Sequence, residues 1–444
     1  MPCKREEIIL NSSCVRTIRG RLPENKFVRK EWLLLLALMI FAFVPSINQL
    51  IVDHLISGLE NNLLNVAGQI EWFDLLNETL LAFLIVPLYF LFNKVANDEN
   101  ALRSRIMQTL TLGFVIYLIV SVFIYFYASS LSSYMGAPNE SVEYLQLETI
   151  GFVLEFISAF MYVVFVVRGK WNYIVLLLVV KIAMLSVGNM LLIPEYGVMG
   201  VAITNIIVNG VLLTASMLLL RKEGLLQFKA RFDTDTIKDY ANTGLFSGST
   251  IFLDNIIYML IIVKMINEVS SIGLYWLANN FIWGWLLIPI VALVEIVKRD
   301  YYKGYSRIYN YFVLVGIIVL IWLCTVPLWN FMFTNIVQAD DPQGVLNILY
   351  MAVPFYVAYA FATVIDGVLT SVGKVKYILW ISLIVNIGYY GMVYSLFLFG
   401  IFEATIPFII TMFGGGMVVH LVFSVVFYLH SKRSLPRSDT EVPA

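Results

Sequence analysis

Three carboxyl groups share one face of a short apolar stretch, QIEWFDLLNETLLAF, at residues 69–83. They belong to Glu71, Asp74 and Glu78. Because each residue of an α-helix turns about 100°, the three side chains fall within about 60° of one another. Carboxyls in such a row can attract cations and can take up or release protons. The chemistry that these residues suggest is therefore the binding of positive charge.

Other acids interrupt apolar segments along the whole chain, and they outnumber the bases. A charged side chain at the centre of a bilayer costs about 2.5–3.5 kcal/mol on insertion scales, so such residues persist mainly where they face a protein interior or a watery cavity. The sequence therefore predicts a net acidic interior. The further acids are Asp53, Glu148, Glu155, Asp254, Glu295 and Asp366, and the bases are Lys181 and Lys264.

The composition places these charges in a membrane protein. The 444 residues are 60% hydrophobic and 13% charged, with a mean hydropathy of +0.83, whereas a soluble domain is about half apolar and a quarter charged. The net charge of −1 offers no basic surface, so we expect no nucleic-acid partner. The three cysteines, Cys3, Cys14 and Cys324, show no metal or redox spacing.

Twelve apolar segments are long enough to cross a bilayer. Each has about 20 residues or more, which as a helix spans a hydrocarbon core of about 30 Å. The first follows a polar, basic stretch without a cleavable apolar core, so we expect no signal peptide. The segments cover residues 32–53, 69–92, 107–132, 143–167, 171–193, 199–220, 245–267, 272–297, 311–333, 344–370, 375–400 and 405–430.

Lysine and arginine alternate between the loops that join these segments. The even-numbered loops and both tails are rich in the two residues, and the odd-numbered loops carry almost none, with Lys264 as the ambiguous case. The positive-inside rule assigns the basic side to the cytoplasm. We therefore expect a multi-pass protein of the cell (plasma or inner) membrane with both termini in the cytoplasm.

The second half of the chain repeats the first at an offset of about 200 residues. SINQLIVD at 46–53 aligns with SGSTIFLD at 247–254, and Pro87 aligns with Pro289. Six spans separate the copies, so the two halves have the same orientation and form a parallel repeat. The predicted fold is an all-α integral membrane protein with twelve transmembrane helices in two six-helix lobes. Its expected parts are a tail at 1–31, an N-lobe at 32–224, a linker at 225–244, a C-lobe at 245–434 and a tail at 435–444.

Several stretches resemble multidrug and toxic compound extrusion (MATE) transporters, over about residues 32–430. FVPSINQLIVDHLISGLENNLLNVAG is similar to the first helix and first exterior loop of that family, and YMGAPNESVEYLQLETIGF to the start of its fourth helix. GNMLLIPEYGVMGVAITNIIVNG resembles a pattern of its fifth and sixth helices, which the wider superfamily of polysaccharide and lipid-linked sugar flippases shares. The resemblance implies a secondary transporter that works by alternating access.

The resemblance also implies where the N-lobe binds a coupling ion, Na⁺ or H⁺. Asp53 matches the family's helix-one carboxylate, and Asn189 matches its helix-five partner. Asn205, preceded by Thr204, stands where some members have a threonine. A second aspartate that some members carry in helix five is replaced here by Ile193.

Helix ten departs from the family pattern as well. Other members place an aspartate at a position that lies near Tyr359 in this sequence, and Asp366 stands directly before Gly367. These departures leave Na⁺ and H⁺ both open as the coupling ion.

Candidate contacts to cargo come from both lobes. Asn279 and Asn280 occupy roughly the repeat position of Glu78, which favours a polar stripe facing a cavity in each lobe. Glu155 and Lys181 lie at similar depth on adjacent spans, where a structural ion pair would hide both charges from lipid. We expect His420 to be a hydrogen-bonded core residue. The predicted substrate cavity is lined by Glu71, Asp74, Glu78, Asp254, Asn279, Asn280 and Asp366.

The leading interpretation is a secondary active antiporter, not an enzyme, that exports organic cations or drugs in exchange for Na⁺ or H⁺. The alternative is a lipid-linked oligosaccharide, polysaccharide or lipid flippase of the same superfamily, whose cavity should carry Arg and Lys. A scaffold or receptor is disfavoured by the intramembrane charge. The sequence contains no phosphate-binding Gly-rich loop, so an ion gradient or a partner must supply any energy. We expect a small-molecule cargo and the bilayer as partners, with no ATPase subunit and no cofactor beyond the coupling ion.

Overall fold

The computed structural model describes residues 29–57, 61–95, 98–225, 233–269, 272–302 and 308–431. Within these ranges the chain is helical apart from short turns. Most of the predicted N-terminal tail, residues 226–232 of the predicted linker and the C-terminal tail 435–444 lie outside the described residues.

The first half of the described chain forms eight helices. Local sequence accounts for their ends, as α6 shows. Asp98 accepts hydrogen bonds from the backbone N–H groups of Asn100 and Ala101 where α6 begins, and Gly136 ends the helix with a φ of 70°, a conformation that favours glycine. The helices are α2 (Arg29–Ser57), α3 (Asn61–Gly68), α4 (Ile70–Leu84), α5 (Val86–Asn93), α6 (Glu99–Met135), α7 (Glu140–Val167), α8 (Trp171–Tyr196) and α9 (Met199–Lys222).

The second half combines α-helices with short π-helical segments, labelled η. Asp233 caps α10 by accepting from the backbone N–H groups of Asp235 and Thr236, so this helix begins inside the stretch expected as linker. The elements are α10 (Thr234–Ile257), η1 (Tyr258–Val263), α11 (Lys264–Glu268), α12 (Ile272–Phe281), η2 (Ile282–Leu286), α13 (Ile288–Tyr302), α14 (Ile308–Phe331), η3 (Met332–Val337), α15 (Pro342–Ser371), α16 (Val375–Leu383), η4 (Ile384–Tyr390), α17 (Gly391–Leu398) and α18 (Ile406–Ser431).

Eleven helical segments of the described chain are long and apolar enough to cross a membrane. A further pair, which joins α12 and η2 to α13 with a bend of 46°, brings the number to twelve and agrees with the hydropathy pattern. The second and eighth spans both break just before a proline, at Pro87 and Pro289, which align in the sequence repeat. Proline has no N–H to donate and its ring clashes with the preceding turn, so the helix cannot continue straight there.

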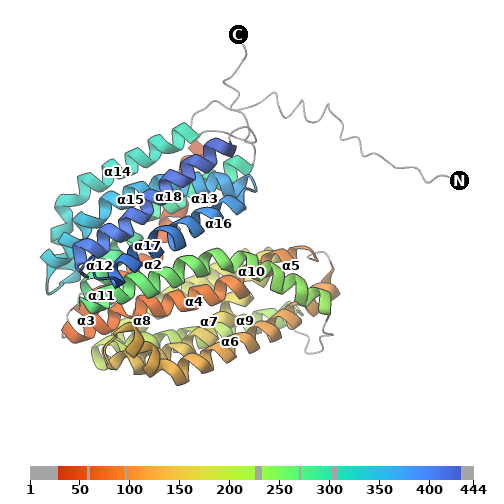
Figure 1. Cartoon of the computed structure of the whole chain (residues 1–444). Helices are drawn as coiled ribbons and strands as arrows, with labels where there is room; N and C mark the ends of the chain where they lie inside the picture. Colours follow the sequence, from red (N-terminus) through yellow and green to blue (C-terminus); the bar gives the residue numbers. More distant parts are fainter. Residues whose placement is uncertain are drawn as a thin grey trace, which may run out of the picture.

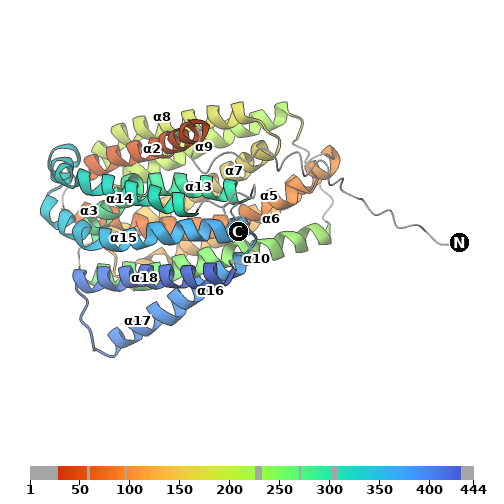
Figure 2. The same ribbon diagram turned by 90° about the horizontal axis from the view of Figure 1, so that it is seen from above.

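The helices form two lobes, and the first helix of each half contacts the other half (Figure 1). The N-lobe helix α2 packs against α8 of its own half and α13 of the second half, and α10 packs against α4 and α5 of the first half. Figure 2 shows α2, α8 and α9 side by side along one edge of the molecule. Because α2 and α10 are repeat mates, these contacts follow the same symmetry as the sequence copies.

The lobes also contact each other at one end of the molecule, which we call the closed end (Figure 1). It comprises residues 61–73 of the first half and residues 264–269 and 272–276 of the second half. Two glycines permit this approach. A Cβ atom on Gly68 would lie 2.8 Å from Cγ1 of Ile272, and one on Gly273 would lie 3.0 Å from the backbone of Leu64. Side chains at either glycine would therefore push α3 and α12 apart.

A pair of glycines spaced by four residues lets α10 lie against α4. A Cβ atom on Gly244 would lie 2.5 Å from the carbonyl oxygen of Phe83, and one on Gly248 would lie 2.3 Å from the ring of the same residue. Helices in membranes associate through such small residues because lipid provides no hydrophobic drive between them.

We predict that Gly248→Ala lowers the thermal stability of the purified protein, with an overpacking cost of about 1–3 kcal/mol. Gly210→Ala in α9 is the matched control, because nothing lies within 4 Å of a Cβ atom at that position. The control should leave the melting temperature equal or raise it, since alanine favours a helix over glycine. Equal stability of the two variants would contradict the α4–α10 contact, and Phe83→Leu should partly rescue Gly248→Ala.

Candidate functional site

Asp53 links the two lobes in the interior of the structure. Its side chain, on α2, is only 7% exposed. The Oδ1 atom accepts a hydrogen bond from Nε2 of Gln49, one turn earlier, at 2.9 Å, and another from Nδ2 of Asn280 on α12 at 3.0 Å. Both donors are neutral amides, and Asn280 belongs to the opposite lobe. The carboxyl of Asp53 therefore forms a hydrogen bond across the lobe interface, and no ion pair to it is found among the described residues.

The other residues that the sequence assigns to the coupling ion have different partners. Asn205 on α9 donates to Oε1 of Glu148 at 2.8 Å. Thr204 donates to the backbone carbonyl of Gly200 at 2.8 Å and is buried. Asn189 on α8 is also buried, and its Oδ1 has no hydrogen-bond partner among the described residues. The predicted ion-binding group is therefore not joined by direct hydrogen bonds to Asp53.

Glu148 is a buried carboxyl whose role the sequence analysis missed. It lies on α7 and is 3% exposed. Its Oε1 accepts from the hydroxyl of Tyr144 at 2.7 Å as well as from Asn205. The signal in the sequence was the spacing of Tyr144, Glu148 and Glu155, since residues four and seven apart share one helix face.

Glu155 and Lys181 form the ion pair that the sequence predicts. Nζ of Lys181 on α8 lies 3.4 Å from Oε1 of Glu155 on α7. The second oxygen of Glu155 accepts from Nδ2 of Asn77 on α4 at 2.9 Å, and the hydroxyl of Tyr117 donates to Oδ1 of Asn77. The helices α4, α6, α7 and α8 are thereby connected through one charge pair, as a structural ion pair would connect them.

The acids of α4 lie beside the first helix of the C-lobe. The side chains of Asp74 and Glu78 are exposed, although both stand within a membrane span. Nδ2 of Asn255 on α10 lies 3.2 Å from Oε2 of Glu78 and 3.1 Å from the hydroxyl of Thr79. The side chain of Glu71 lies outside the described residues. Two of the three carboxyls with which the sequence analysis began are thus exposed.

Asp254 is held by polar groups of its own lobe. Its Oδ1 accepts from the hydroxyl of Ser382 at 2.6 Å and from Nδ2 of Asn386 at 2.5 Å, which come from α16 and η4. Its side chain is nevertheless exposed. The hydrogen bonds fix the position of the carboxyl, while the exposed atoms can still meet a ligand.

Asp366 and His420 form a second polar pair in the C-lobe. Nε2 of His420 on α18 lies 2.6 Å from Oδ2 of Asp366 on α15, and the hydroxyl of Ser424 donates to Oδ1 of Asp366 at 2.8 Å. The prediction of a hydrogen-bonded histidine agrees with this contact. The side chains are 18% exposed for Asp366 and 24% exposed for His420.

Tyr359 connects the acids of the two lobes. It is within electrostatic range of Asp366, Asp254 and Glu78. These carboxyls from α15, α10 and α4 therefore lie around one tyrosine, and the substrate cavity that the sequence predicts there stays a prediction. Asn279 on α12 accepts a hydrogen bond from the hydroxyl of Tyr356 at 3.3 Å.

The closed end is sealed by polar contacts between the lobes. Nε2 of Gln69 donates to Oδ1 of Asn267 at 2.8 Å, and Nδ2 of Asn267 donates back to Oε1 of Gln69 at 3.1 Å and to the carbonyl of Met135 at 2.8 Å. Nζ of Lys264 lies 3.8 Å from the ring centroid of Tyr134. The chain therefore holds its lobes together at this end by several independent contacts.

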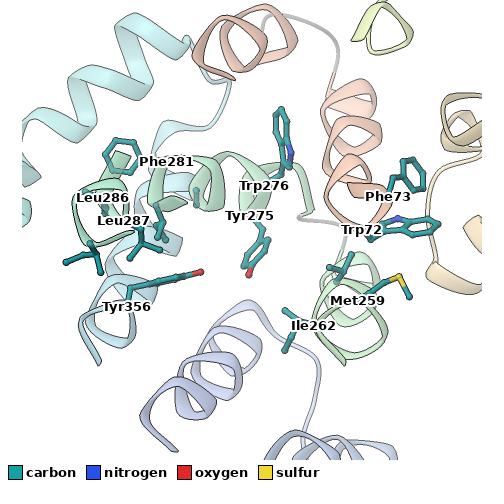
Figure 3. Close-up of a cluster of buried hydrophobic side chains, with 14 of the residues drawn as sticks. Trp72, Phe73, Met259, Ile262, Tyr275, Trp276, Phe281, Leu286, Leu287 and Tyr356 are labelled. Atoms are coloured by element: carbon teal, nitrogen blue, oxygen red, sulfur yellow. The ribbon is translucent and has the colours of Figure 1, made fainter. Parts of the chain in front are cut away.

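Buried, mostly apolar side chains of both lobes pack together next to these polar contacts. Figure 3 shows Trp72 and Phe73 of α4 beside Met259 of η1. The hydroxyls of Tyr275 and Tyr356 point toward the same space in that view. All five residues are buried, so they leave little room for water between the lobes at this level.

Comparison with known proteins identifies the architecture. No family model and no curated protein sequence matches the chain. An inward-facing conformation of a multidrug resistance MATE family transporter of the MOP superfamily superposes with a TM-score of 0.72 at 16% identity, over 90% of this chain and 97% of that chain. The chain has the MATE transporter fold.

Other structures with the MATE or MOP architecture give lower scores. An outward-facing conformation of a multidrug resistance MATE family transporter gives a TM-score of 0.62 at 16% identity, over 90% of this chain and 94% of that one. A MOP superfamily transporter from Pyrococcus furiosus gives 0.63 at 16% identity over the same shares. Its description infers a different function for that protein from a binding pocket of reversed polarity.

The MATE fold confirms the predicted architecture of twelve helices in two lobes. The fold and the candidate spans of the described residues indicate a multi-pass membrane protein. An identity of 16% carries the fold alone, so the cargo has to be argued from the side chains of this chain.

We predict that cysteines introduced as Gln69→Cys and Asn267→Cys, in a background without the native cysteines, cross-link rapidly on oxidation. The two side chains are hydrogen-bonded across the lobes, which places the introduced thiols near each other. A protease site inserted within residues 226–232 makes the measurement simple, because the halves stay joined after cleavage only if the cross-link has formed.

The matched control for the cross-link is Gln69→Cys with Ser424→Cys, whose partner lies on α18 beside Asp366. This pair should separate after cleavage. The description of the closed end is contradicted if the Gln69–Asn267 pair also separates while both of its thiols react with a maleimide.

Proposed function

We propose that this chain is a secondary active antiporter that exports organic cations across the cell membrane in exchange for H⁺ or Na⁺. The lobes would alternate between the state closed at residues 61–73 and 264–276 and a state open at that end. We propose cytoplasmic termini, in line with the basic even-numbered loops. An ion gradient would drive transport, without an ATPase subunit.

One observation carries the choice of a cationic cargo. Asp74, Glu78 and Asp254 are exposed carboxyls on spans that face each other, α4 and α10. Tyr359 lies within electrostatic range of two of them and of Asp366. A site with several carboxylates in a low-dielectric surrounding attracts a cation and repels an anion.

The bases of the described spans do not offset these acids. Lys181 is bound to Glu155 in the N-lobe, and Lys264 lies over the ring of Tyr134 at the closed end. An anionic lipid-linked sugar would need free Arg or Lys in the cavity. The distribution of charge therefore favours the cation exporter over the flippase.

We propose that Asp53 carries the coupling ion of the N-lobe. Its hydrogen bond to Asn280 joins α2 to the opposite lobe. An ion that occupies the Asp53 carboxyl competes with the amide for the same oxygen, so ion binding there would loosen an interlobe contact. Asn189 on α8 and Thr204 on α9 are both buried, and we keep them as candidates for the same ion-binding network.

A lipid or lipid-linked sugar flippase remains the second candidate, because one feature favours it. An apolar groove of about 330 Å³ lies between α8 and α9, lined by residues within 183–192 and 204–208. Such a groove could hold an acyl or polyprenyl chain. The transport experiment below separates the two candidates.

We predict that the protein in liposomes moves a planar dye cation such as ethidium when a proton or sodium gradient is imposed. Asp254→Asn should reduce the initial rate about tenfold, which corresponds to roughly 1.4 kcal/mol of lost attraction. Dye fluorescence reports the rate directly. Asp53→Asn should abolish the dependence on the gradient, because the amide cannot exchange an ion.

Glu295→Gln is the matched control for these variants. Glu295 is a carboxyl on α13 whose side chain is 53% exposed and paired with Lys298, three residues later. Its rate should equal that of the unaltered protein. The proposal fails if a broad panel of cations shows no gradient-dependent transport, and flipping of a lipid-linked sugar in the same liposomes would then establish the alternative.

A further inference from the structure

The histidine of α18 is placed where a proton can substitute for a bound cation. His420 is one of three histidines in the chain. Its Nε2 lies 2.6 Å from Oδ2 of Asp366, and it is also in electrostatic contact with Asp254. One imidazole therefore faces two carboxyls, of which the second is an exposed candidate for binding cargo.

Among the titratable groups around His420, Asp366 and Asp254 are its main charged neighbours. The helix α15 contributes Asp366, and α10 contributes Asp254. The segment η4 contributes the phenols of Tyr389 and Tyr390, which pack on the glycines of α18. The helix α11 contributes Lys264, which lies over Tyr134 at the closed end, and α16 contributes Tyr377, which stacks on Phe427.

We propose that His420 is the proton carrier of the C-lobe, and that binding of a cation at Asp254 and Asp366 expels its proton. This inference rests on the cationic cargo proposed above. A protonated imidazole supplies one positive charge to the two acids. An arriving organic cation supplies the same charge, so the two compete for one electrostatic site and cannot both be bound at full strength.

The proton step follows from the position of the ring. The N–H at Nε2 donates to Oδ2 of Asp366, and it stays in place in the neutral ring. The N–H bond at Nδ1 therefore breaks, its electron pair remains on nitrogen, and the proton passes to water. One positive charge enters the site and one leaves it, so the charge of the lobe is conserved.

The exposure of His420 and Asp366 distinguishes a proton carrier from a purely structural pair. A purely structural histidine–carboxylate pair inside a membrane would be sealed from water. Here 24% of the His420 side chain and 18% of the Asp366 side chain are exposed. We assign this exposed surface to the space between the lobes, where water can take up the proton. The hydroxyl of Ser424 meanwhile occupies the other oxygen of Asp366 and keeps the carboxylate oriented toward the ring.

The chain allows a direct spectroscopic test, because a sample labelled with ¹⁵N at histidine gives ring signals from only three residues. The variants His54→Gln and His430→Gln assign two of them and leave the third to His420 without altering that residue. At a fixed, mildly acidic pH the signal of His420 should be that of an imidazolium. Addition of ethidium to saturation should convert it to a neutral imidazole, while the other two signals stay unchanged.

Proton release provides the second measurement. A pH indicator in weakly buffered solution should report about one proton released per ethidium bound by the unaltered protein, as reciprocal linkage requires. His420→Gln should still bind the dye, but proton release should fall at least several-fold. His430→Gln, at the far end of the same helix, is the matched control and should release protons normally.

The outcomes distinguish this inference from the proposed function. If ethidium binds but the His420 signal does not change, whether it is that of a neutral imidazole or of an imidazolium throughout, the histidine is not the carrier. In that case only this inference falls. If no cation of a broad panel binds, the inference and the proposed function both fall. Unchanged proton release in His420→Gln would likewise overturn the role of the histidine.

Discussion

Charge inside a membrane has to be matched within the protein, because hydrocarbon offers neither water nor counter-ions. The structure meets this constraint in three ways. Lys181 matches Glu155 as an ion pair, His420 meets the carboxyl of Asp366, and neutral amides hold the carboxyl of Asp53. On α4 and α10, Glu78 and Asp254 accept hydrogen bonds from neutral side chains and stay exposed. With the exposed Asp74, they are the acids that we propose for the cargo.

The sequence repeat places the charged residues between two similar lobes, so that a movement of the lobes can affect them. Its two copies place α2 and α10 so that each contacts the opposite half. The second span of each copy breaks just before an aligned proline, Pro87 or Pro289, and the span at Pro289 bends there by 46°. The acids therefore come to lie between two bodies of similar build. Motion of one body relative to the other changes the surroundings of every carboxyl at the interface.

The sequence was sufficient to predict the spans, the repeat and the Glu155–Lys181 pair, because the bilayer fixes the length and polarity of each helix. It was insufficient to predict which faces meet. Asn205 was expected near Asp53 but bonds to Glu148. Polar and apolar residues are spread evenly around α9, so its sequence does not distinguish the face that turns inward. The bond from Asn280 to Asp53 depends in the same way on the docking of the two lobes.

The polarity of the interior is the central claim, and equilibrium binding to the purified protein tests it most directly. An organic cation and an organic anion of equal size and ring number can be compared by calorimetry. We predict that the cation binds, that the anion does not, and that acid weakens binding of the cation because protons compete for the same carboxyls. Binding of the anion in preference to the cation would contradict the account and would point to a cavity of the opposite polarity.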